Sequence, residues 1–306
     1  MKKIKYLVNK SIKTHTLFQD AFCYFLKKIK FASNYTAGLI SLDKTYYKLK
    51  KKYQKFIDNY KISDTIKEKS KFVWIFWYQG LQDAPELVKK CINSVKENYS
   101  GWNIVIITKD NISEYIEIPD YIIDKVEKKI ITLTHFSDIL RAALLVKHGG
   151  LWLDATVLCT GNMIENFDKH DLFVYRNGWM DMENINMASW LIYSKTNNEI
   201  LNLTLDLLKE YWKKHNYLVN YFLFHMFFKM ATEKYNAQWS KIPYMTQTNN
   251  HLMALELNNN FNIERYNQIV KITDFHKLSY KVEINKNIKS FYYMIIKGEK
   301  NEIYKN

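Results

Sequence analysis

Residues 135–157 read HFSDILRAALLVKHGGLWLDATV, and this segment sets the class of the whole protein. Apolar residues recur at helical spacing over 136–147, and the two glycines that follow, at 149 and 150, end that helix. The apolar run at 151–157 is typical of a buried strand, and it carries a single carboxylate, Asp154. An amphipathic helix that turns directly into a buried strand indicates an α/β protein.

The flanking sequence continues the alternation of strands and helices. Upstream, KFVWIFWYQG at 71–80 predicts a buried strand, and Pro85 begins a helix that runs to Asn98. The order strand, helix, strand, helix, strand predicts a parallel sheet with right-handed crossovers. The other predicted elements are strands at 103–108, 171–175 and 188–194, and helices at 119–129, 197–214 and 217–231.

Positive charge gathers at the amino-terminal end of the chain. Residues 1–70 contain 17 lysines and five acidic residues, a net charge of +12, so residues 71–306 carry only +2 of the total of +14. A basic segment beside a nearly neutral body indicates an anionic partner for that segment. We therefore expect a basic helical region over 1–70 and a globular domain over 71–306.

A basic amphipathic helix is predicted within that region. From Thr16 to Phe31 apolar residues recur at helical spacing, and lysines crowd the end. Such a helix can lie on an anionic membrane surface or pack its aromatic face on the body, and the sequence leaves both open. The patch at 49–56 resembles a nucleic-acid stripe, but lysine outnumbers arginine throughout, and arginine is the better reader of bases and phosphates. We therefore expect no nucleic-acid partner.

Composition excludes several classes of protein. A chain of 306 residues with 47% hydrophobic and 25% charged residues can bury a substantial core, which excludes disorder and collagen. Cys23, Cys91 and Cys159 are too far apart for a disulfide framework or a CxxC metal site. We expect a cytoplasmic protein, because no apolar run is long enough to span a membrane and no signal-peptide pattern opens the chain.

Three charged residues of the 135–157 segment are candidates for chemistry. Asp138 and Arg141 stand three positions apart on the predicted helix, so they share a face. Asp154 lies in an apolar strand, where an unpaired charge is costly, so it needs a cation, a metal or a ring of donors. Each also has an ordinary structural explanation, since the helix pair can be a surface ion pair and Asp154 can cap a loop.

Together these residues resemble the signature SDxxR…GGxYxDxD of retaining GT-A-type sugar-nucleotide glycosyltransferases. The resemblance is to the family 32 enzymes and the capsular polysaccharide synthesis proteins related to them, and it extends from about Lys71 to Lys281. It implies a GT-A-like, Rossmann-like mixed sheet flanked by helices, with a catalytic domain over 71–306. The matching segments are SDILRAALLVKHGGLWLDATV (137–157), VWIFWYQG (73–80), DAPELVKKCINSVKEN (83–98), YFLFH (221–225) and HKLSYK (276–281).

The resemblance also implies roles for the three charged residues. Asp138 and Arg141 would grip the donor sugar and its adjacent phosphate, and Asp154 would bind the ribose and a divalent cation. Carboxylate oxygens suit Mg²⁺ or Mn²⁺. The sequence departs from the signature at Thr156, which stands where the family often has a second aspartate; its hydroxyl can still be a metal ligand beside Asp154, but it brings no charge.

Further candidates lie outside the central segment. His276 is a candidate metal ligand, or a partly buried loop histidine, and Lys277 or Lys281 can neutralise phosphate. Trp77 and Tyr78 can stack on the nucleotide base, or belong to the strand core. The polar segment at 177–189 is an acceptor loop or an ordinary surface loop, with candidates Asp181, Glu183 and Asn186.

The pattern as a whole predicts a hexosyltransferase of bacterial surface-polysaccharide synthesis. The expected donor is a nucleotide diphosphate sugar, with UDP as the expected nucleotide, and the expected acceptor is a polysaccharide or a lipid-linked oligosaccharide. Retention of configuration follows from the resemblance, and the basic region would bring the enzyme to the inner face of the plasma membrane. The alternatives are a non-enzymatic basic module bound to membrane or nucleic acid, and a phosphosugar transferase.

Overall fold

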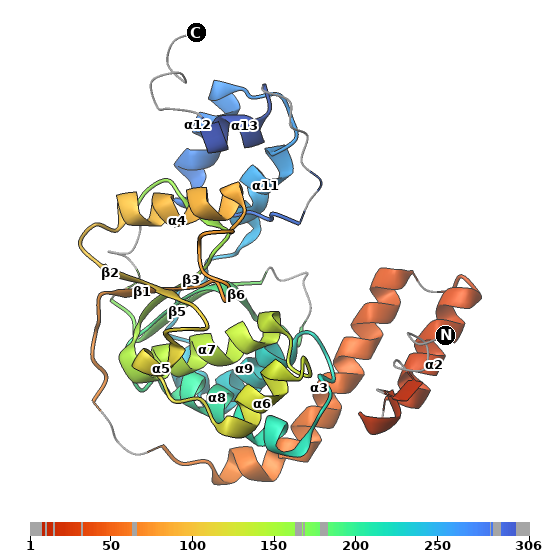
Figure 1. Ribbon diagram of the computed structural model, residues 1–306. Helices are drawn as coiled ribbons and strands as arrows, with labels where there is room; N and C mark the ends of the chain where they lie inside the picture. The colour runs from red at the N-terminus through yellow and green to blue at the C-terminus, as the bar shows by residue number, and fades with distance from the viewer. Residues whose placement is uncertain are drawn as a thin grey trace.

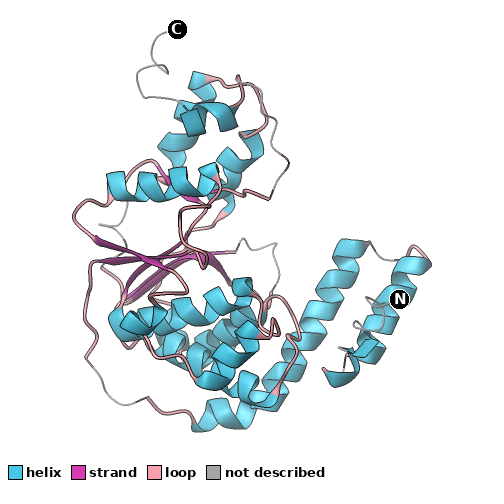
Figure 2. Cartoon of the chain, viewed as in Figure 1, coloured by secondary structure: helices cyan, strands magenta, loops and turns pink. Residues whose placement is uncertain are grey.

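A central sheet lies between two groups of helices, and a pair of basic helices projects from one side (Figure 1). The computed structural model describes residues 8–9, 11–14, 16–31, 33–62, 66–162, 167, 169–177, 183–281, 283 and 289–297. The projecting pair consists of α2 (Leu17–Lys28) and α3 (Asn34–Asn59). Figure 2 shows the strands of the sheet gathered between the helical groups.

The sheet is mixed, which confirms the fold class that the resemblance implies. Its strands are β1 (Phe72–Phe76), β2 (Asn103–Ile107), β3 (Gly150–Asp154), β5 (Leu172–Arg176) and β6 (Met187–Ser194), in the order β2-β1-β3-β6-β5. β1 pairs in parallel with β2 and β3, as predicted, whereas β6 pairs antiparallel with β3 and β5. Since Phe76 lies opposite Asp154, the chains leaving β1 and β3 emerge at one edge of the sheet.

The prediction of one strand over 151–157 is wrong. β3 ends at Asp154, a turn covers Ala155 and Thr156, and the chain continues as β4 (Val157–Cys159). β4 leaves the main sheet and pairs antiparallel with β7 (Phe275–Lys277). The break places Asp154 at a strand tip rather than inside a strand.

The glycine turn before β3 is required by the backbone. Gly150 has a φ of +96°, and a Cβ at this position would lie 2.4 Å from the carbonyl oxygen of Phe72. Residue 150 must therefore lack a side chain for β3 to lie against β1. The helix before the turn, α7 (Leu133–His148), begins where the Thr132 hydroxyl accepts a hydrogen bond from the amide of His135.

Helices cover the two faces of the sheet (Figure 1). One face carries α5 (Ile112–Tyr115), α6 (Asp120–Glu127), α7, α8 (Glu199–Lys214), α9 (Leu223–Lys234) and α10 (Asn236–Trp239). The other carries α4 (Glu86–Asn98), beyond which lie η2 (Thr248–His251), α11 (Leu252–Glu256), α12 (Ile263–Ile272) and α13 (Phe291–Lys297).

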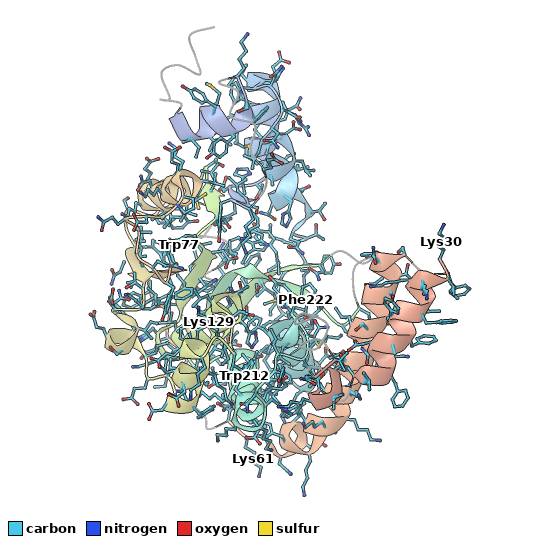
Figure 3. All side chains as sticks on the ribbon, turned by 45° about the vertical axis from the view of Figure 1, so that its right-hand side comes forward. Lys30, Lys61, Trp77, Lys129, Trp212 and Phe222 are labelled. Carbon is cyan, nitrogen blue, oxygen red and sulfur yellow. The ribbon has the colours of Figure 1, made fainter. Side chains whose placement is uncertain are left out.

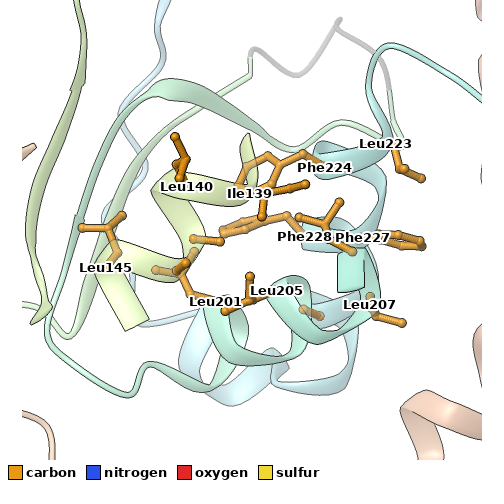
Figure 4. Packing of buried hydrophobic residues seen from close by; sticks show 14 of the residues in the cluster. Ile139, Leu140, Leu145, Leu201, Leu205, Leu207, Leu223, Phe224, Phe227 and Phe228 are labelled. Carbon is orange, nitrogen blue, oxygen red and sulfur yellow. The ribbon is translucent and has the colours of Figure 1, made fainter. Parts of the chain in front are cut away.

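Side chains alternate along the strands between two hydrophobic clusters. Trp74 and Trp152 lie in the cluster formed with α7, α8 and α9, and their neighbours Val73 and Leu151 lie in the cluster formed with α4. Figure 4 shows the first cluster, in which leucines of α7 and α8 meet the phenylalanines of α9. This packing fixes α7, and with it the positions of Asp138 and Arg141.

α3 is packed into the body, whereas the sequence analysis predicted a basic helical region over 1–70 without this individual helix or its packing. Tyr46 donates a hydrogen bond from its hydroxyl to Oε1 of Glu233 on α9 at 2.7 Å, and Nζ of Lys50 lies 2.7 Å from Oε2 of that carboxylate. The boundary at residue 70 stays a prediction, and the helix before it shares the core of the body. Its residues in that core are Leu42, Tyr46, Leu49, Tyr53 and Ile57.

Candidate active site

A cavity of about 730 Å³ opens where β1 and β3 end. Its walls come from the residues after β1, from α7, from the tip of β3, from the start of α9 and from β7 with the loop that follows it. Side chains from the ends of β1 and β3 and from α7 thus line the same cavity. The polar and aromatic lining residues include Trp77, Tyr78, Ser137, Asp138, Arg141, Asp154, Thr156, Tyr221, His225, Lys277 and Lys281.

Arg141 links the helix to the strand tip. Its Nη1 lies 3.2 Å from Oδ1 of Asp138, and its Nη2 lies 3.3 Å from Oδ1 of Asp154. Nη1 also donates to the carbonyl oxygen of Ser189 at 2.8 Å, and Nη2 donates to Oγ of Ser137 at 3.1 Å. Arg141 is 3% exposed, so the two carboxylates offset the cost of burying its charge.

Asp138 is held in a buried chain of hydrogen bonds. The indole N–H of Trp212 donates to Nε2 of His135 at 3.0 Å, so the proton of this imidazole resides on Nδ1. Nδ1 lies 3.2 Å from Oδ2 of Asp138 and donates to it, while Arg141 binds the other oxygen. The carboxylate is therefore bound at both oxygens by side chains of α7, and Trp212 of α8 positions His135 in turn.

Asp154 accepts hydrogen bonds from three side chains. Trp152 donates to Oδ1 at 3.1 Å beside Arg141, and Lys277 donates from Nζ to Oδ2 at 2.9 Å. Burial alone would raise the pKa of Asp154, but the charges of Lys277 and Arg141 outweigh it and hold the pKa below its ordinary value. Asp154 is ionised at neutral pH as the partner of two cations.

The register of β4 and β7 brings Lys277 to the strand tip. Val157 lies opposite Lys277, and the amide of Leu278 donates to the carbonyl oxygen of Thr156 at 2.9 Å. Nζ of Lys277 thereby reaches both Asp154 and Oγ1 of Thr156, the latter at 2.7 Å. The predicted phosphate-binding lysine is thus placed in the cavity with Asp138, Arg141 and Asp154.

His276 is not brought to the cavity. Because side chains alternate along β7, it points to the opposite side from Lys277, and its Nε2 lies 2.9 Å from Oγ1 of Thr160. Burial lowers its pKa to about 4, which keeps the imidazole neutral. The structure separates His276 from Asp154 and Thr156, with which the sequence analysis grouped it.

The other predicted residues differ in their placement. Trp77 and Tyr78 line the cavity, and the ring of Trp77, labelled in Figure 3, meets the ring of Tyr280 edge-on at 5.5 Å. Lys281 lines it from an exposed turn. Of the loop candidates, Glu183 is exposed, Asn186 donates to Oγ1 of Thr232 at 2.9 Å away from the cavity, and Asp181 lies outside the described residues.

His225 and Tyr221 line the cavity, yet the sequence analysis assigned them no role. His225 is buried, and its Nδ1 has no hydrogen-bond partner among the residues that the structure describes. Nε of Arg141 is likewise buried and unpaired in the described part of the chain. Unpaired buried polar atoms in a cavity wall indicate a polar ligand. The signal in the sequence was the spacing of Tyr221 and His225, four positions apart in YFLFH.

The side chains at the strand tip do not fit a divalent cation. Nζ of Lys277 already lies between the oxygens of Asp154 and Thr156, the two oxygens that the signature would offer a metal. The remaining carboxylate oxygen of Asp154 accepts hydrogen bonds from Arg141 at 3.3 Å and from Trp152 at 3.1 Å. Within the described ranges, no three His, Cys, Asp or Glu side chains gather as metal ligands.

The fold and site define an α/β protein with a charged ligand cavity at the carboxyl edge of its sheet. The chain belongs to the capsular polysaccharide synthesis protein family, whose sequence model matches residues 10–296. This match confirms the resemblance to capsular polysaccharide synthesis proteins. No curated protein matches the sequence.

Several solved structures are similar to this chain. PaToxG glycosyltransferase is 17% identical, with 83% of this chain and 97% of that chain covered and a TM-score of 0.40. The apo form of the glycosyltransferase GlyE from Streptococcus pneumoniae TIGR4 is 10% identical, with coverages of 77% and 62% and a TM-score of 0.40. A glycosyltransferase involved in glycosylation of the major capsid of PBCV-1 is 15% identical, with coverages of 67% and 92% and a TM-score of 0.32.

Among the helices described, none combines the length and apolar character needed to cross a bilayer.

Proposed function

We propose that this protein is a glycosyltransferase of capsular polysaccharide synthesis that transfers a hexose from a nucleotide diphosphate sugar, with UDP as the nucleotide. The observation that carries the proposal is the row of alternating charges Asp138, Arg141, Asp154 and Lys277 along one cavity wall. Two fixed cations suit a diphosphate, and two fixed carboxylates suit sugar or ribose hydroxyls. The acceptor in this proposal is a polysaccharide or a lipid-linked oligosaccharide.

The proposed reaction retains the configuration of the sugar. Asp138 and Asp154 are both bound to cations, which makes them poor nucleophiles, so we propose attack by the acceptor hydroxyl on the same face as the leaving group. The bond between the anomeric carbon and the phosphate oxygen breaks with its electron pair going to that oxygen. The acceptor oxygen bonds to the anomeric carbon, and its proton passes to the departing phosphate, giving a nucleoside diphosphate.

The nucleotide base has a place beside the end of β1. Trp77 and Tyr78 line the cavity with aromatic rings on which a base can stack. Tyr78 also lines a second cavity of about 680 Å³ formed with α5 and α6. The positions of Trp77 and Tyr78 are therefore compatible with stacking on the nucleotide base.

The test of the proposed function is donor binding followed by product analysis. Calorimetric titration should show UDP and one or more UDP-hexoses binding, and incubation should release UDP. Asp154→Asn should slow donor cleavage by about 100-fold, because Arg141 and Lys277 lose the charge that positions them. Release of UMP instead would favour a phosphosugar transferase.

The matched control is Asp124→Asn on α6, whose carboxylate is exposed and lies 3.8 Å from Nζ of Lys128. This variant should bind and cleave the donor as the unaltered protein does. Absence of nucleotide binding in the unaltered protein, or equal activity of Asp154→Asn, would contradict the proposed function.

We further propose that α2 docks on an anionic membrane surface. The side of α2 that packs on α3 carries Gln19, Cys23 and Leu26, and Gln19 donates to the carbonyl oxygen of Ser41 at 2.6 Å. Its aromatic stripe is turned outward instead. Phe18 is 92% exposed and Phe25 is 55% exposed. Figure 3 shows α2 on the outer side of the molecule, with Lys30 at its end.

The charged and apolar side chains exposed on α2 together favour a lipid bilayer as the binding partner of this helix. Lys27 and Lys28 are exposed beside the aromatic stripe, so the surface offers rings to the interfacial region and ammonium groups to anionic headgroups. Packing of the aromatic stripe on the body was the alternative at the level of sequence, and the exposure of Phe18 and Phe25 supports membrane docking instead. Lipid-linked acceptors reside at such a surface.

Liposome flotation of the full chain tests the membrane proposal. Because α3 shares the core, point variants are preferable to removal of residues 1–70. Phe18→Ser combined with Phe25→Ser should weaken binding to phosphatidylglycerol vesicles by at least about tenfold, since burial of each phenylalanine stabilises the bound state. Leu255→Ser, a change at a 74% exposed leucine of α11, is the control and should leave flotation unchanged. Equal flotation of all three proteins would contradict the proposal.

A further inference from the structure

The position of Lys277 bears on how the proposed transfer handles the charge of its leaving group. The signature that this chain resembles offers two carboxylates at the strand tip, whereas this chain offers Asp154 and the uncharged Thr156. Nζ of Lys277 lies 2.9 Å from one and 2.7 Å from the other. A single ammonium group therefore binds both side chains.

The surrounding structure holds this ammonium group in place. The pairing of Val157 with Lys277 and the bond from the amide of Leu278 to the carbonyl of Thr156 fix the backbone on both sides of the turn. The side chain of Lys277 is 21% exposed, and it also lines the cavity. An ammonium group has three N–H donors, and the two bonds to Asp154 and Thr156 leave one for an anionic ligand.

A divalent cation would have to displace this ammonium group. It would then meet one carboxylate, one neutral hydroxyl and the guanidinium of Arg141, whose Nη2 lies 3.3 Å from Asp154. Divalent cations of the Mg²⁺ and Mn²⁺ type prefer several oxygen ligands, carboxylates among them. The local charge thus favours the lysine over a metal.

We infer that Lys277 takes the place of the divalent cation and that, with Arg141, it neutralises the diphosphate leaving group, so that the proposed transfer needs no metal. This inference rests on the proposed function. As the bond to the anomeric carbon breaks, negative charge develops on the phosphate oxygen. A preorganised cation beside that oxygen stabilises the developing charge, which is the task that a metal performs in other sites.

The first experiment compares UDP binding in EDTA and in Mn²⁺. The dissociation constant should agree within about twofold between the two conditions, because a metal that does not bind cannot be linked to nucleotide affinity. Lys277→Gln should weaken UDP binding by about 10- to 100-fold, the loss expected for one charge-assisted hydrogen bond. Lys277→Arg should restore most of the affinity, and Lys128→Gln, a change at an exposed lysine of α6, should have no effect.

The second experiment titrates Mn²⁺ alone into the full chain and into Asp154→Asn, with electron paramagnetic resonance as the readout. No saturable binding is expected in either protein. Saturable binding that Asp154→Asn abolishes would overturn the inference, as would a tenfold or larger gain in UDP affinity on addition of Mn²⁺. Failure of UDP to bind in both conditions would count against the proposed function instead. The Mn²⁺ titration would still decide whether Lys277 or a divalent cation is the partner of Asp154.

Discussion

The protein uses positive charge in two opposite ways. The projecting helices carry exposed lysines with few acidic neighbours, and 12 of the 14 net positive charges belong to residues 1–70. The cavity, in a nearly neutral body, holds Arg141 and Lys277, each bound to a carboxylate and largely buried. Exposed charges act on partners through a long-range field, whereas buried and paired charges act through fixed geometry. In the proposed function, the exposed charges of the basic region serve a partner surface, and the buried, paired charges serve the transfer reaction.

Removal of the buried arginine should have the largest effect, and it tests whether a buried, paired charge differs from an exposed one in its contribution to stability. Arg141→Ala leaves Asp138 and Asp154 without their shared cation, so the free energy of unfolding should fall by about 3–5 kcal/mol. Urea unfolding followed by circular dichroism measures the change.

The control for that prediction is Arg265→Ala. Arg265 is 45% exposed in its side chain and lies 2.9 Å from Glu256, so its loss should cost only about 0–1 kcal/mol. Equal losses for the two variants would show that burial does not separate the two kinds of charge.

The next largest effect concerns the buried histidine of the cavity. Burial lowers the pKa of His225 from 6.5 to about 4, with Asp138 and Asp154 opposing the shift and Arg141 and His135 adding to it. Between these two pH values the unfolded chain binds a proton that the folded protein does not. The contribution of His225 to the free energy of unfolding should therefore be constant above pH 6.5 and fall by about 3 kcal/mol as the pH drops to 4.

His225→Gln removes this titration and should flatten part of the pH dependence of unfolding. His276 has a similarly lowered pKa of about 4, so the variant keeps the share that comes from His276. Urea unfolding at pH 7.5, 5.5 and 4.5 provides the measurement. The same pH slope in both proteins would mean that His225 does not resist protonation.

The sequence predicted the site best where local geometry determines it. The three-residue spacing of Asp138 and Arg141 fixes a shared helix face, and the glycine turn directs the next strand back toward it, so both could be placed beside Asp154. The parallel pairing of the first three strands also followed from local order. Gly150 is the reason that this register is possible, because no side chain fits there.

The sequence named candidates but could not place them where distant segments determine the contacts. Lys277 and His276 are adjacent, and only the register of β4 with β7 decides that the lysine faces Asp154 and the histidine faces Thr160. His225 reaches the cavity through the packing of α9 on α7. The helix α3 was a different kind of miss, since Leu42, Tyr46, Leu49, Tyr53 and Ile57 already have helical spacing in the sequence. The many lysines of this segment led to its interpretation as a basic patch at 49–56 rather than as a helix with an apolar face.

The smallest expected effect makes the comparison most direct, because it applies one chemical change in both regions. Lys27→Gln combined with Lys28→Gln removes two exposed charges from α2, and each should cost about 1 kcal/mol of affinity for anionic vesicles. The free energy of unfolding should change by less than about 0.5 kcal/mol, as is usual for surface sites. UDP affinity should not change, whereas Lys277→Gln should have the reverse pattern, with weaker nucleotide binding and unchanged flotation.

Salt separates the two regions further. Raising the ionic strength shortens the Debye length from about 10 Å at 0.1 M to about 3 Å at 1 M, so vesicle binding through exposed lysines should be lost. Lys277 and Asp154, 2.9 Å apart and partly shielded from solvent, are screened much less, and the stability that their pairing supplies should persist. Flotation and urea unfolding at the two salt concentrations measure the two responses. If Lys27→Gln with Lys28→Gln altered UDP affinity as strongly as Lys277→Gln does, the field of the projecting helices would reach the cavity, and the division between surface charge and site charge would be wrong.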